Sequence, residues 1–376
     1  MRSPERFDTI VVGGGQAGLA MGYYLAKQDR DFVVLDAGER IGDVWRNRWD
    51  SLRLFTPAAL SGLPGMPFPF PGGYFPTKEE TADYLEEYAA KFGLPTRLGR
   101  RVDSLRCDGD GYLLGVGSER YLAANVVVAT GPYHAPRVPD FAARLDPSIN
   151  QLHSSAYRSP DRLPEGDALV VGAGNSGAEI SLELATTRKT RLSGRDTGNV
   201  PGGVREKRLP GHILLGWLTG WWIVGRLTVD TRLGRKGRAF ERGRGAPLVR
   251  FSPTDLIKAG VERVPRVEGV VDGKPLLADG RALEVACVVW ATGFRPDFGW
   301  IEPPVFGEDG YPLQYRGAVD AAPGLYFLGL PFQHTFLSAT VGGVGEDARH
   351  IAGHLAGKRR VISSRRSPVP GPGLSR

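Results

Sequence analysis

Two glycine-rich turns limit the folds open to this chain more than any other feature of its sequence. The first occupies residues 13–18 and the second residues 172–177, and each follows a short apolar run that is typical of a buried strand. An apolar helical stretch follows each turn, and each copy closes with another apolar run that ends in Ala-Thr-Gly, at residues 129–131 and 291–293. One such turn is weak evidence, but two in register predict an internal repeat of nucleotide-binding domains.

The residue types within each turn match the needs of a bound diphosphate. In the first copy Gly13 permits the tight turn, Gly15 lets the backbone approach a pyrophosphate, and Gly18 allows the helix to pack on the strand. Backbone amides at the helix start then point at the anion. We therefore expect an α/β fold with two Rossmann-like, three-layer dinucleotide-binding domains. Further candidate contacts are Gln16 and Ala17 in the first turn and Gly172, Gly174, Asn175, Ser176 and Gly177 in the second.

The residue at the end of the next strand separates two kinds of dinucleotide. Asp36 ends an apolar run, where its carboxylate can accept hydrogen bonds from ribose hydroxyls and would repel a 2′-phosphate. The first site therefore suits FAD or NAD. At the matching place in the second copy, Arg191, Ser193 and Arg195 favour the 2′-phosphate of NADPH. The alternatives are that these arginines are only solvated, or that Asp196 makes the second site one for NADH.

The last part of the chain again has a strand followed by a helix. Residues 324–329 are typical of a buried strand, and the glycines at residues 342–345 open a helix that we expect to run to about Leu355. A helix N-terminus aimed at a flavin would stabilise the negative charge that builds up there on reduction. Gly329 and Gly343 are therefore candidate cofactor contacts, and a plain terminal helix is the alternative.

Charge and cysteine content argue against several classes of protein. The net charge is +7, but residues 357–376 carry basic and no acidic side chains, which leaves the rest of the chain near neutral and argues against a nucleic-acid-binding face. We expect this tail to be disordered. Cys107 and Cys287 lie far apart, in no pattern that would bind a metal or form a redox disulfide, and they indicate a reducing, cytoplasmic setting.

The segment from about residue 200 to residue 250 is the least regular. Trp217, Trp221 and Trp222 have helical spacing and either fill a core or line an apolar substrate channel, and a weak contact with a membrane surface is the third alternative. The uncharged, tryptophan-containing run of residues 213–225 is too short to span a bilayer, and the N-terminus has no signal-peptide pattern. We expect a mobile basic loop formed by Arg232, Arg235, Lys236, Arg238, Arg242 and Arg244.

These motifs resemble those of the class B flavin monooxygenases, a group that includes flavin-containing, plant YUCCA-type and bacterial CzcO-like oxidoreductases. The resemblance runs from about Phe7 to Leu355. Gly42 and the three residues after it are similar to the family's Gly-Gly-x-Trp near the flavin, which makes Val44 and Trp45 candidate flavin contacts. Residues 52–57, 62–71 and 294–297 are similar to further stretches of the family.

The resemblance implies how the domains are connected. In this family the Ala-Thr-Gly links, here with Thr130 and Gly131 in the first, carry the chain between domains, and the NADPH domain is inserted into the FAD domain. We expect the FAD-binding domain to comprise residues 1–163 and 291–356. The NADPH-binding domain would comprise residues 164–290, with a variable insert at about 200–250.

The resemblance also implies a reaction. NADPH would reduce FAD, dioxygen would form a peroxyflavin, and a small, fairly apolar molecule would be oxygenated at nitrogen, sulfur or a carbonyl carbon. The expected partners are the substrate and dioxygen, and the expected state is a monomer or homodimer. Two other functions stay open: an uncoupled NADPH oxidase or flavin reductase, and a nucleotide-bound sensor that does not turn over.

The chain departs from the family at the motif between the domains. Phe-x-Gly-x-x-x-His-x-x-x-Tyr is present only as His153 and Tyr157, with Pro147 and Ile149 in the places of Phe and Gly. His153 either touches the nicotinamide cofactor or is a structural histidine. The asparagine that supports the oxygenated flavin in animal-type members has no counterpart near residues 55–56, and the sequence points to no single catalytic residue.

Overall fold

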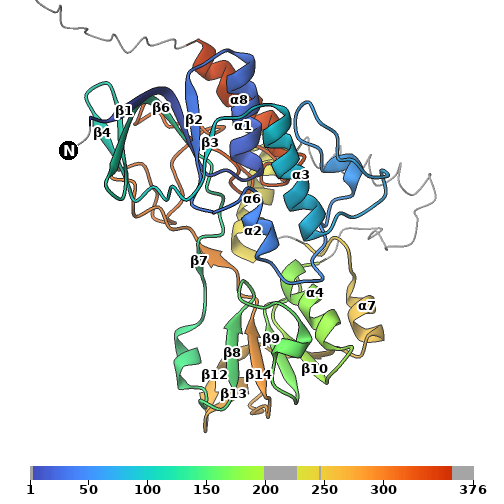
Figure 1. The fold of residues 1–376 in the computed structure, drawn as a ribbon. Helices are drawn as coiled ribbons and strands as arrows, with labels where there is room; N and C mark the ends of the chain where they lie inside the picture. Colours follow the sequence, from blue (N-terminus) through green and yellow to red (C-terminus); the bar gives the residue numbers. More distant parts are fainter. Residues whose placement is uncertain (1–2, 199–226, 245–246, 358–376) are drawn as a thin grey trace, which may run out of the picture.

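The computed structural model describes residues 3–198, 227–244 and 247–357, which form two domains one above the other (Figure 1). The first domain is built on a seven-stranded sheet. Its strands run in the order β3 (Thr96–Arg97), β2 (Phe32–Leu35), β1 (Glu5–Val12), β6 (Glu119–Val128), β5 (Gly111–Val116) and β4 (Ser104–Asp108), and β16 (Leu325–Phe327) also pairs with β6. Strands β2, β1, β6 and β16 are parallel, whereas β4, β5 and β6 form an antiparallel meander.

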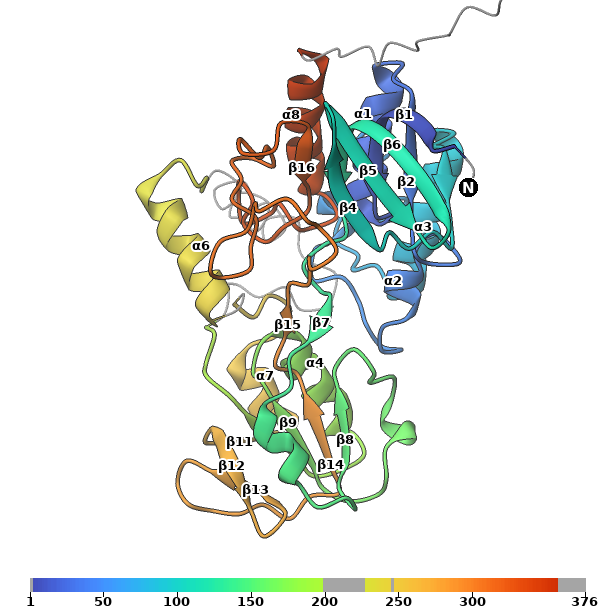
Figure 2. The same cartoon turned by 90° about the vertical axis from the view of Figure 1, so that its left-hand side faces the viewer.

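Apolar runs form these central strands because both faces of the sheet are covered. On one face, Val11 and Val127 pack in a core cluster with residues of α1 (Gln16–Lys27), α3 (Lys78–Lys91) and α8 (Val344–Ala356). On the other face, Ile10 and Val126 pack in a second cluster with the meander and with residues 298–305. The helices, the parallel strands and the material on the second face give the expected layered arrangement (Figure 2).

The second domain is built on a five-stranded sheet in which every pair is parallel. Its order is β11 (Glu262–Val264), β10 (Thr190–Ser193), β9 (Ala168–Val171), β14 (Cys287–Trp290) and β8 (Asn150–His153). Two apolar clusters again cover the two faces. The other elements of this domain are α4 (Asn175–Leu184), α7 (Pro253–Lys258) and the antiparallel hairpin of β12 (Val267–Val271) and β13 (Lys274–Leu277).

Two antiparallel strands carry the chain between the domains. The first Ala-Thr-Gly leads into β7 (Ala135–Pro136), the second leads into β15 (Phe294–Arg295), and these two short strands pair with each other. After β15 the chain returns to the first sheet as β16 and α8. The second domain is therefore inserted into the first.

The boundary that we expected at residue 163 is wrong. Strand β8 pairs in register with β14, so that His153 lies beside Trp290 in the second sheet. The crossing lies at residues 131–137, which follow β6 and include β7. Residues 138–163, with the 3-10 turns Asp140–Arg144 and Pro160–Arg162, therefore belong with the second domain.

The basic loop expected after residue 230 is also wrong, because a helix, α6 (Arg232–Arg244), occupies this place. It lies against the first domain, where a Cβ atom added at Gly237 would come within 3.1 Å of the Phe332 ring (Figure 2). The three tryptophans of residues 217–222 and the tail from residue 358 lie outside the described residues. Within the described part of the chain, no helix is long and apolar enough to cross a membrane.

Candidate functional site

The first glycine turn combines two crowded positions with one open position. Gly13 has a φ of +108°, and a Cβ atom there would lie 2.7 Å from the carbonyl oxygen of Ala129. A Cβ atom at Gly18 would lie 1.8 Å from the carbonyl oxygen of Gly13. At Gly15, by contrast, no atom lies within 4 Å of the added Cβ. Gly13 and Gly18 are therefore required by the fold, whereas Gly15 leaves space free in front of α1.

The second turn has the same geometry. Gly172 has a φ of +112°, and its added Cβ would lie 2.2 Å from the carbonyl oxygen of Ala291. The added Cβ at Gly177 would lie 1.7 Å from the carbonyl oxygen of Gly172, and the one at Gly174 meets nothing within 4 Å. The repeat seen in the sequence is thus a repeat in three dimensions.

The helices that follow these turns begin without side-chain caps. Gly15 and Gly174 are their N-caps, neither makes a side-chain hydrogen bond, and neither helix has an acidic residue in its first turn. The first backbone N–H groups of a helix have no partner within it, and the helix dipole is positive at that end. Both helix starts are therefore suited to bind a diphosphate.

Other predicted residues of the turns have roles within the protein. Ala17 is buried, and the added Cβ of Gly329 (φ +84°) would lie 2.9 Å from its Cβ, so the glycine lets the end of β16 approach α1. Asn175 uses its side chain to hold residues 247–249: its amide donates to the carbonyl of Pro247 and accepts from the backbone N–H of Val249. Ser176 is half-buried beside it, as Gln16 is in the first turn.

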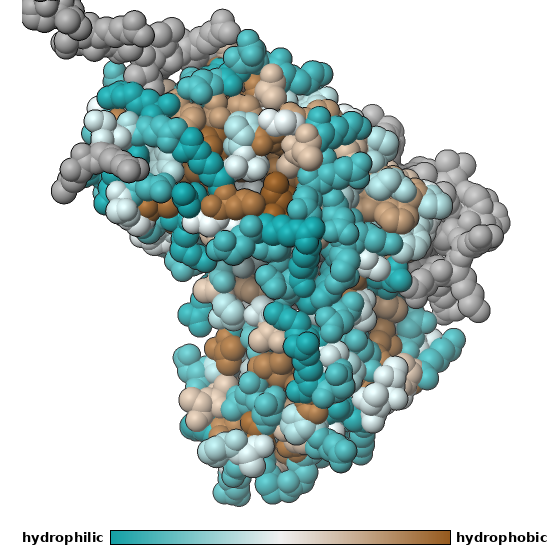
Figure 3. Space-filling view, viewed as in Figure 1, coloured by the Kyte–Doolittle hydropathy of each residue, from teal (hydrophilic) through white to brown (hydrophobic). Residues whose placement is uncertain are grey.

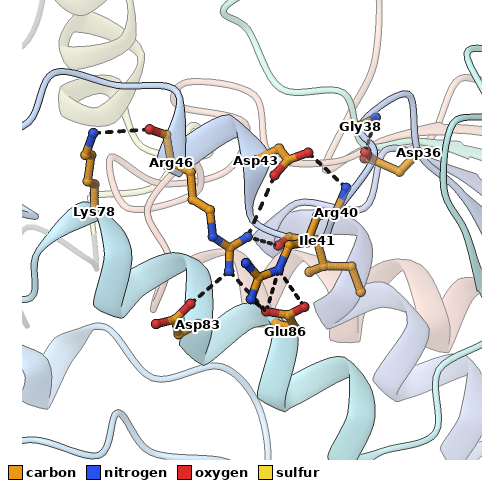
Figure 4. A network of polar contacts seen from close by, with 9 residues as sticks. All are labelled: Asp36, Gly38, Arg40, Ile41, Asp43, Arg46, Lys78, Asp83 and Glu86. Carbon is orange, nitrogen blue, oxygen red and sulfur yellow. Dashed lines mark hydrogen bonds and ion pairs between the residues drawn. The ribbon is translucent and has the colours of Figure 1, made fainter. Parts of the chain in front are cut away.

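Asp36 turns its carboxylate toward the backbone of Gly14 and Gly38, and Figure 4 shows the contact with Gly38. One carboxylate oxygen accepts a hydrogen bond from the backbone N–H of Gly14, and the other accepts one from the N–H of Gly38 at 2.7 Å. Each oxygen keeps a second lone pair. A ribose hydroxyl that lies beside the turn therefore finds an acceptor whose position is already fixed.

The short helix α2 (Asp43–Arg46) is fixed on α3 by polar contacts (Figure 4). Arg46 donates to the carbonyl of Ile41 and pairs with Asp83 and Glu86. Lys78, whose side chain is 5% exposed, donates to the carbonyls of Arg46 and of Arg48. The segment that follows α2 thus has a defined backbone.

The same segment reaches from the first domain into the second. Trp45 is half-buried and packs against core clusters of both domains, whereas Val44 is 52% exposed. Trp49 and Leu52 are buried among side chains of the second domain, together with Tyr157. The indole N–H of Trp45 is buried and has no hydrogen-bond partner in the described chain, so it is available to donate to an acceptor on a ligand.

The two Ala-Thr-Gly links each end in a glycine with a left-handed backbone, and the first link also contacts a histidine. Gly131 and Gly293 both have positive φ angles, +73° and +81°. The hydroxyl of Thr130 lies 3.1 Å from the Nε2 atom of His134. Burial lowers the pKa of His134, so that its ring is neutral at neutral pH.

Of the three residues predicted to bind the 2′-phosphate, two are already engaged within the protein and one is exposed. Arg191 is paired with Asp167 at 2.9 Å and with Glu262 at 3.3 Å, and Ser193 is fully buried, where it donates to the carbonyl of Pro265. These partners leave Arg195 as the exposed member of the predicted group.

Sequence reasoning missed a second arginine at this strand end. Arg263, on β11, donates to the carbonyl of Gly194 at 2.9 Å, directly before Arg195. Burial lowers the pKa of Arg263. Since β11 lies beside β10, the parallel pairing of their ends is the signal that could have identified it.

The start of α8 is more closed than the glycine turns. A Cβ atom at Gly343 would lie 2.1 Å from the carbonyl oxygen of Leu337. A glycine is therefore needed here so that the start of α8 can pack against the backbone of Leu337. In the first turn of α8, Asp347 is 2% exposed and its carboxylate oxygens have no hydrogen-bond partner in the described chain. Burial raises the pKa of Asp347, which the sequence did not single out.

A small apolar cluster joins three distant segments of the chain. Phe75 and Val249 are buried in it, and partly buried neighbours come from residues 55–60 and 336–337. Figure 3 shows a hollow in the first domain, bordered by hydrophobic residues, on the face that Figure 1 presents. These surfaces are suited to flat or apolar ligands.

Comparison with known proteins identifies the family. Residues 10–198 match the family described as pyridine nucleotide-disulphide oxidoreductase. A CzcO-like oxidoreductase of Geobacillus kaustophilus (strain HTA426) is 41% identical and covers 92% of this chain and 97% of its own. "Probable indole-3-pyruvate monooxygenase YUCCA7" of Arabidopsis thaliana is 30% identical over 92% of this chain and 87% of its own. A mutant of the flavin monooxygenase from Stenotrophomonas maltophilia has 26% identity and a TM-score of 0.76, covering 94% and 99% of the two chains.

The chain belongs to the class B flavin monooxygenase family. It is therefore an oxidoreductase. Its two cysteines are both free, with Cys107 exposed and Cys287 buried.

The two residues of the family's linker motif that this chain keeps, His153 and Tyr157, both make hydrogen bonds within the protein. The Nδ1 atom of His153 accepts the backbone N–H of Ser155, so its Nε2–H donates to the carbonyl of Gly293. The hydroxyl of Tyr157 is bonded to Glu183 at 2.8 Å. Both ring nitrogens of His153 have partners within the protein, which favours the structural role over a contact with the nicotinamide cofactor.

Proposed function

We propose that this oxidoreductase holds FAD at its first glycine turn, holds NADPH at its second, and inserts one atom of dioxygen into a small organic molecule. The observation that carries the proposal is the duplicated geometry of an open glycine, Gly15 or Gly174, before an uncapped helix start. Each is suited to one diphosphate. When bound, NADPH supplies a hydride, and FAD passes the electron pair to dioxygen.

For FAD, the residues of the first domain provide orientation. The N–H groups at the start of α1 would hold the diphosphate, Asp36 would accept from a ribose hydroxyl, and the buried indole N–H of Trp45 would donate to a ring acceptor. The fold already fixes the position of each of these groups, so binding of FAD would cost little conformational entropy in the protein.

For the nicotinamide cofactor, we assign the 2′-phosphate to Arg195 and Arg263. The exposed Arg195 and the guanidinium of Arg263 lie at the ends of adjacent parallel strands. Arg191 is committed to Asp167 and Glu262. Two cations at this place favour NADPH over NADH, because the 2′-phosphate is the only charged difference between the two.

The substrate we propose is small and partly apolar, oxidised at nitrogen, sulfur or a carbonyl carbon. The apolar cluster of Phe75 and Val249 is the surface that favours such a molecule. YUCCA7 is named for indole-3-pyruvate, which combines an aromatic ring with a carbonyl group.

The second function is an NADPH oxidase that releases hydrogen peroxide. It is favoured by the sequence near residues 55–56, which has no counterpart of the asparagine that supports the oxygenated flavin in animal-type members of the family. The hydroxyl of Thr56 there lies 2.8 Å from that of Ser61, in the buried interior. A sensor that never turns over is disfavoured, because a protein that only holds one nucleotide would not need a second open position, and both Gly15 and Gly174 are open.

The test measures where the electrons go. NADPH consumption, product and hydrogen peroxide are quantified together for a panel of amines, sulfides and ketones. The proposal expects at least one substrate whose product accounts for most of the NADPH consumed. Peroxide in full yield with every substrate would contradict it and would favour the oxidase.

A further inference from the structure

Arg48 holds a positive charge at the junction of the two domains. Its guanidinium carbon lies 5.9 Å from the ring centroids of both Tyr133 and Phe294, and these two rings lie 5.3 Å apart. Tyr133 comes from the first link between the domains and Phe294 from the second. The arginine is thus placed where both links meet the segment after α2, within reach of stacking on both rings.

No acidic side chain pairs with Arg48 in the described part of the chain. Its neighbours along the sequence differ: Arg46 is paired with Asp83 and Glu86, and Arg40 with Glu86. The acid nearest along the chain, Asp50, is bonded to Lys78 at 2.9 Å. A partly buried cation usually has an anionic partner, since removing its charge from water is costly.

The charged groups around Arg48 add to its need for an anionic partner. Burial lowers the pKa of Arg48, Tyr133 partly offsets this effect, and Arg158 lowers the pKa further. Arg158 itself donates to the carbonyls of Ser155 and Tyr157. Arg48 in turn contributes to the lowered pKa of His153, after burial. The junction is therefore a region of positive potential that an anion would relieve.

The site is positioned and reachable. Lys78 holds the carbonyl of Arg48 at 2.8 Å and that of Arg46 at 3.2 Å, so the backbone that carries the guanidinium is fixed. Arg48 is half-buried, and Tyr133 beside it is 60% exposed. A guanidinium presents two parallel N–H groups that match a carboxylate.

We propose that Arg48 binds a carboxylate group on the substrate, so that the natural substrate is a small organic acid whose apolar part lies toward the oxidised position. This inference rests on the proposed function, because it assigns the charged end of that enzyme's substrate. The phosphates of the dinucleotides are a poorer match for Arg48. The open glycine turns serve the two diphosphates, and Arg195 and Arg263 serve the 2′-phosphate.

The test uses binding as well as turnover. Benzoate, phenylacetate and phenylpyruvate, and the methyl ester of each, are titrated into the oxidised FAD-loaded enzyme, and the visible spectrum of the flavin is followed. The enzymes compared are wild type, Arg48→Met, Arg48→Lys and, as a matched control, Arg101→Ala. Arg101 is exposed and lies in the loop before β4, away from the links.

The expected result is specific to the charge of the ligand. Wild type binds at least one acid about tenfold more tightly than its ester, as a charge-assisted hydrogen bond would give. In Arg48→Met the ratio of acid to ester affinity falls to about one, Arg48→Lys keeps an intermediate ratio, and Arg101→Ala keeps the wild-type ratio. A merely structural role of Arg48 would not change this ratio selectively.

Three outcomes would overturn the inference. They are equal affinities of wild type for every acid and its ester, an acid preference that survives in Arg48→Met, and a loss in Arg48→Met that is confined to the affinity for NADP⁺. Failure of the proposed function gives a different result, whatever the binding titrations show: either hydrogen peroxide accounts for all the NADPH consumed with every substrate, or the wild-type flavin stays oxidised under anaerobic NADPH.

Discussion

The Nε2 atom of His153 donates a hydrogen bond to the carbonyl oxygen of Gly293, 2.9 Å away and 140 residues further along the chain. This contact connects the end of β8 to the second link. It adds to the pairing of β8 with β14, in which His153 lies beside Trp290. The Nε2–H group can donate to this carbonyl in the neutral and in the protonated ring, whereas Nδ1 accepts the N–H of Ser155 only when the ring is neutral. Burial lowers the pKa of His153, which favours the neutral ring.

Acid should therefore destabilise the protein before its carboxylates titrate. The pKa of folded His153 lies below the ordinary value of 6.5, so the unfolded chain takes up the proton first as the pH falls. Stability is complete above this value and is lost as the pH falls below it, and His134 and His350, whose pKa values burial also lowers, act in the same direction. Urea unfolding at about pH 7.5 and about pH 5.5 measures the loss. His153→Gln, which takes up no proton, should lose less on acidification, and a higher urea midpoint at the lower pH would contradict the account.

Two alanine substitutions in the first turn should separate folding from FAD binding. Gly18→Ala puts its Cβ 1.8 Å from the carbonyl oxygen of Gly13, and we expect it to cost about 3 kcal/mol of unfolding free energy or to prevent folding. Gly15→Ala meets no protein atom within 4 Å, so the protein should fold while its methyl group blocks the diphosphate. Thermal unfolding and the FAD content of the purified variants measure the two effects. Normal FAD content in Gly15→Ala would show that the diphosphate lies elsewhere.

The matching substitution in the second turn should leave FAD in place. Gly174→Ala also meets open space, and its methyl group would stand between α4 and the second diphosphate. We expect normal flavin content and an NADPH dissociation constant raised about tenfold or more. Gly15→Ala is the reciprocal control. Loss of FAD from Gly174→Ala, with NADPH binding intact, would reverse the assignment of the two sites.

Arginines at the strand ends of the second domain should set the preference for NADPH. Removal of a charge-assisted hydrogen bond to the 2′-phosphate is worth about 1.5–3 kcal/mol, so Arg195→Ala with Arg263→Ala should lower the NADPH-to-NADH ratio of kcat/KM about tenfold or more. Arg191→Ala is the control, because its partners Asp167 and Glu262 tie it to the protein. If the ratio fell in Arg191→Ala and not in the double variant, the 2′-phosphate would belong to Arg191 instead.

The sequence predicted those features that depend on local sterics. Gly13 and Gly18 are needed because any side chain would meet the backbone of the same turn or of the adjacent strand, and that requirement is visible in the spacing alone. The two Ala-Thr-Gly links were visible for the same reason. The structure confirms that they precede a paired crossing between the domains.

The features that it missed depend on partners distant in sequence. Strand β8 has the sequence Asn-Gln-Leu-His, which has no apolar run, so the second domain was expected to begin too late. The roles of Arg191 and Arg263 follow from side-by-side strands, which counting from a glycine does not show. Helix α6 looked like a loop because of its charges. Its glycines, however, allow close packing, as at Gly234, where a Cβ atom would lie 1.9 Å from the carbonyl oxygen of Thr228.

An anaerobic titration of the purified protein with NADPH tests the central claim most directly. That claim is that two equivalent glycine turns bring a flavin and a reduced nicotinamide together in one chain. It predicts that the protein carries FAD and that about one equivalent of NADPH removes the visible absorbance of the flavin, with NADH much less effective. A protein that takes up no FAD, or a flavin that stays oxidised in excess NADPH, would contradict it.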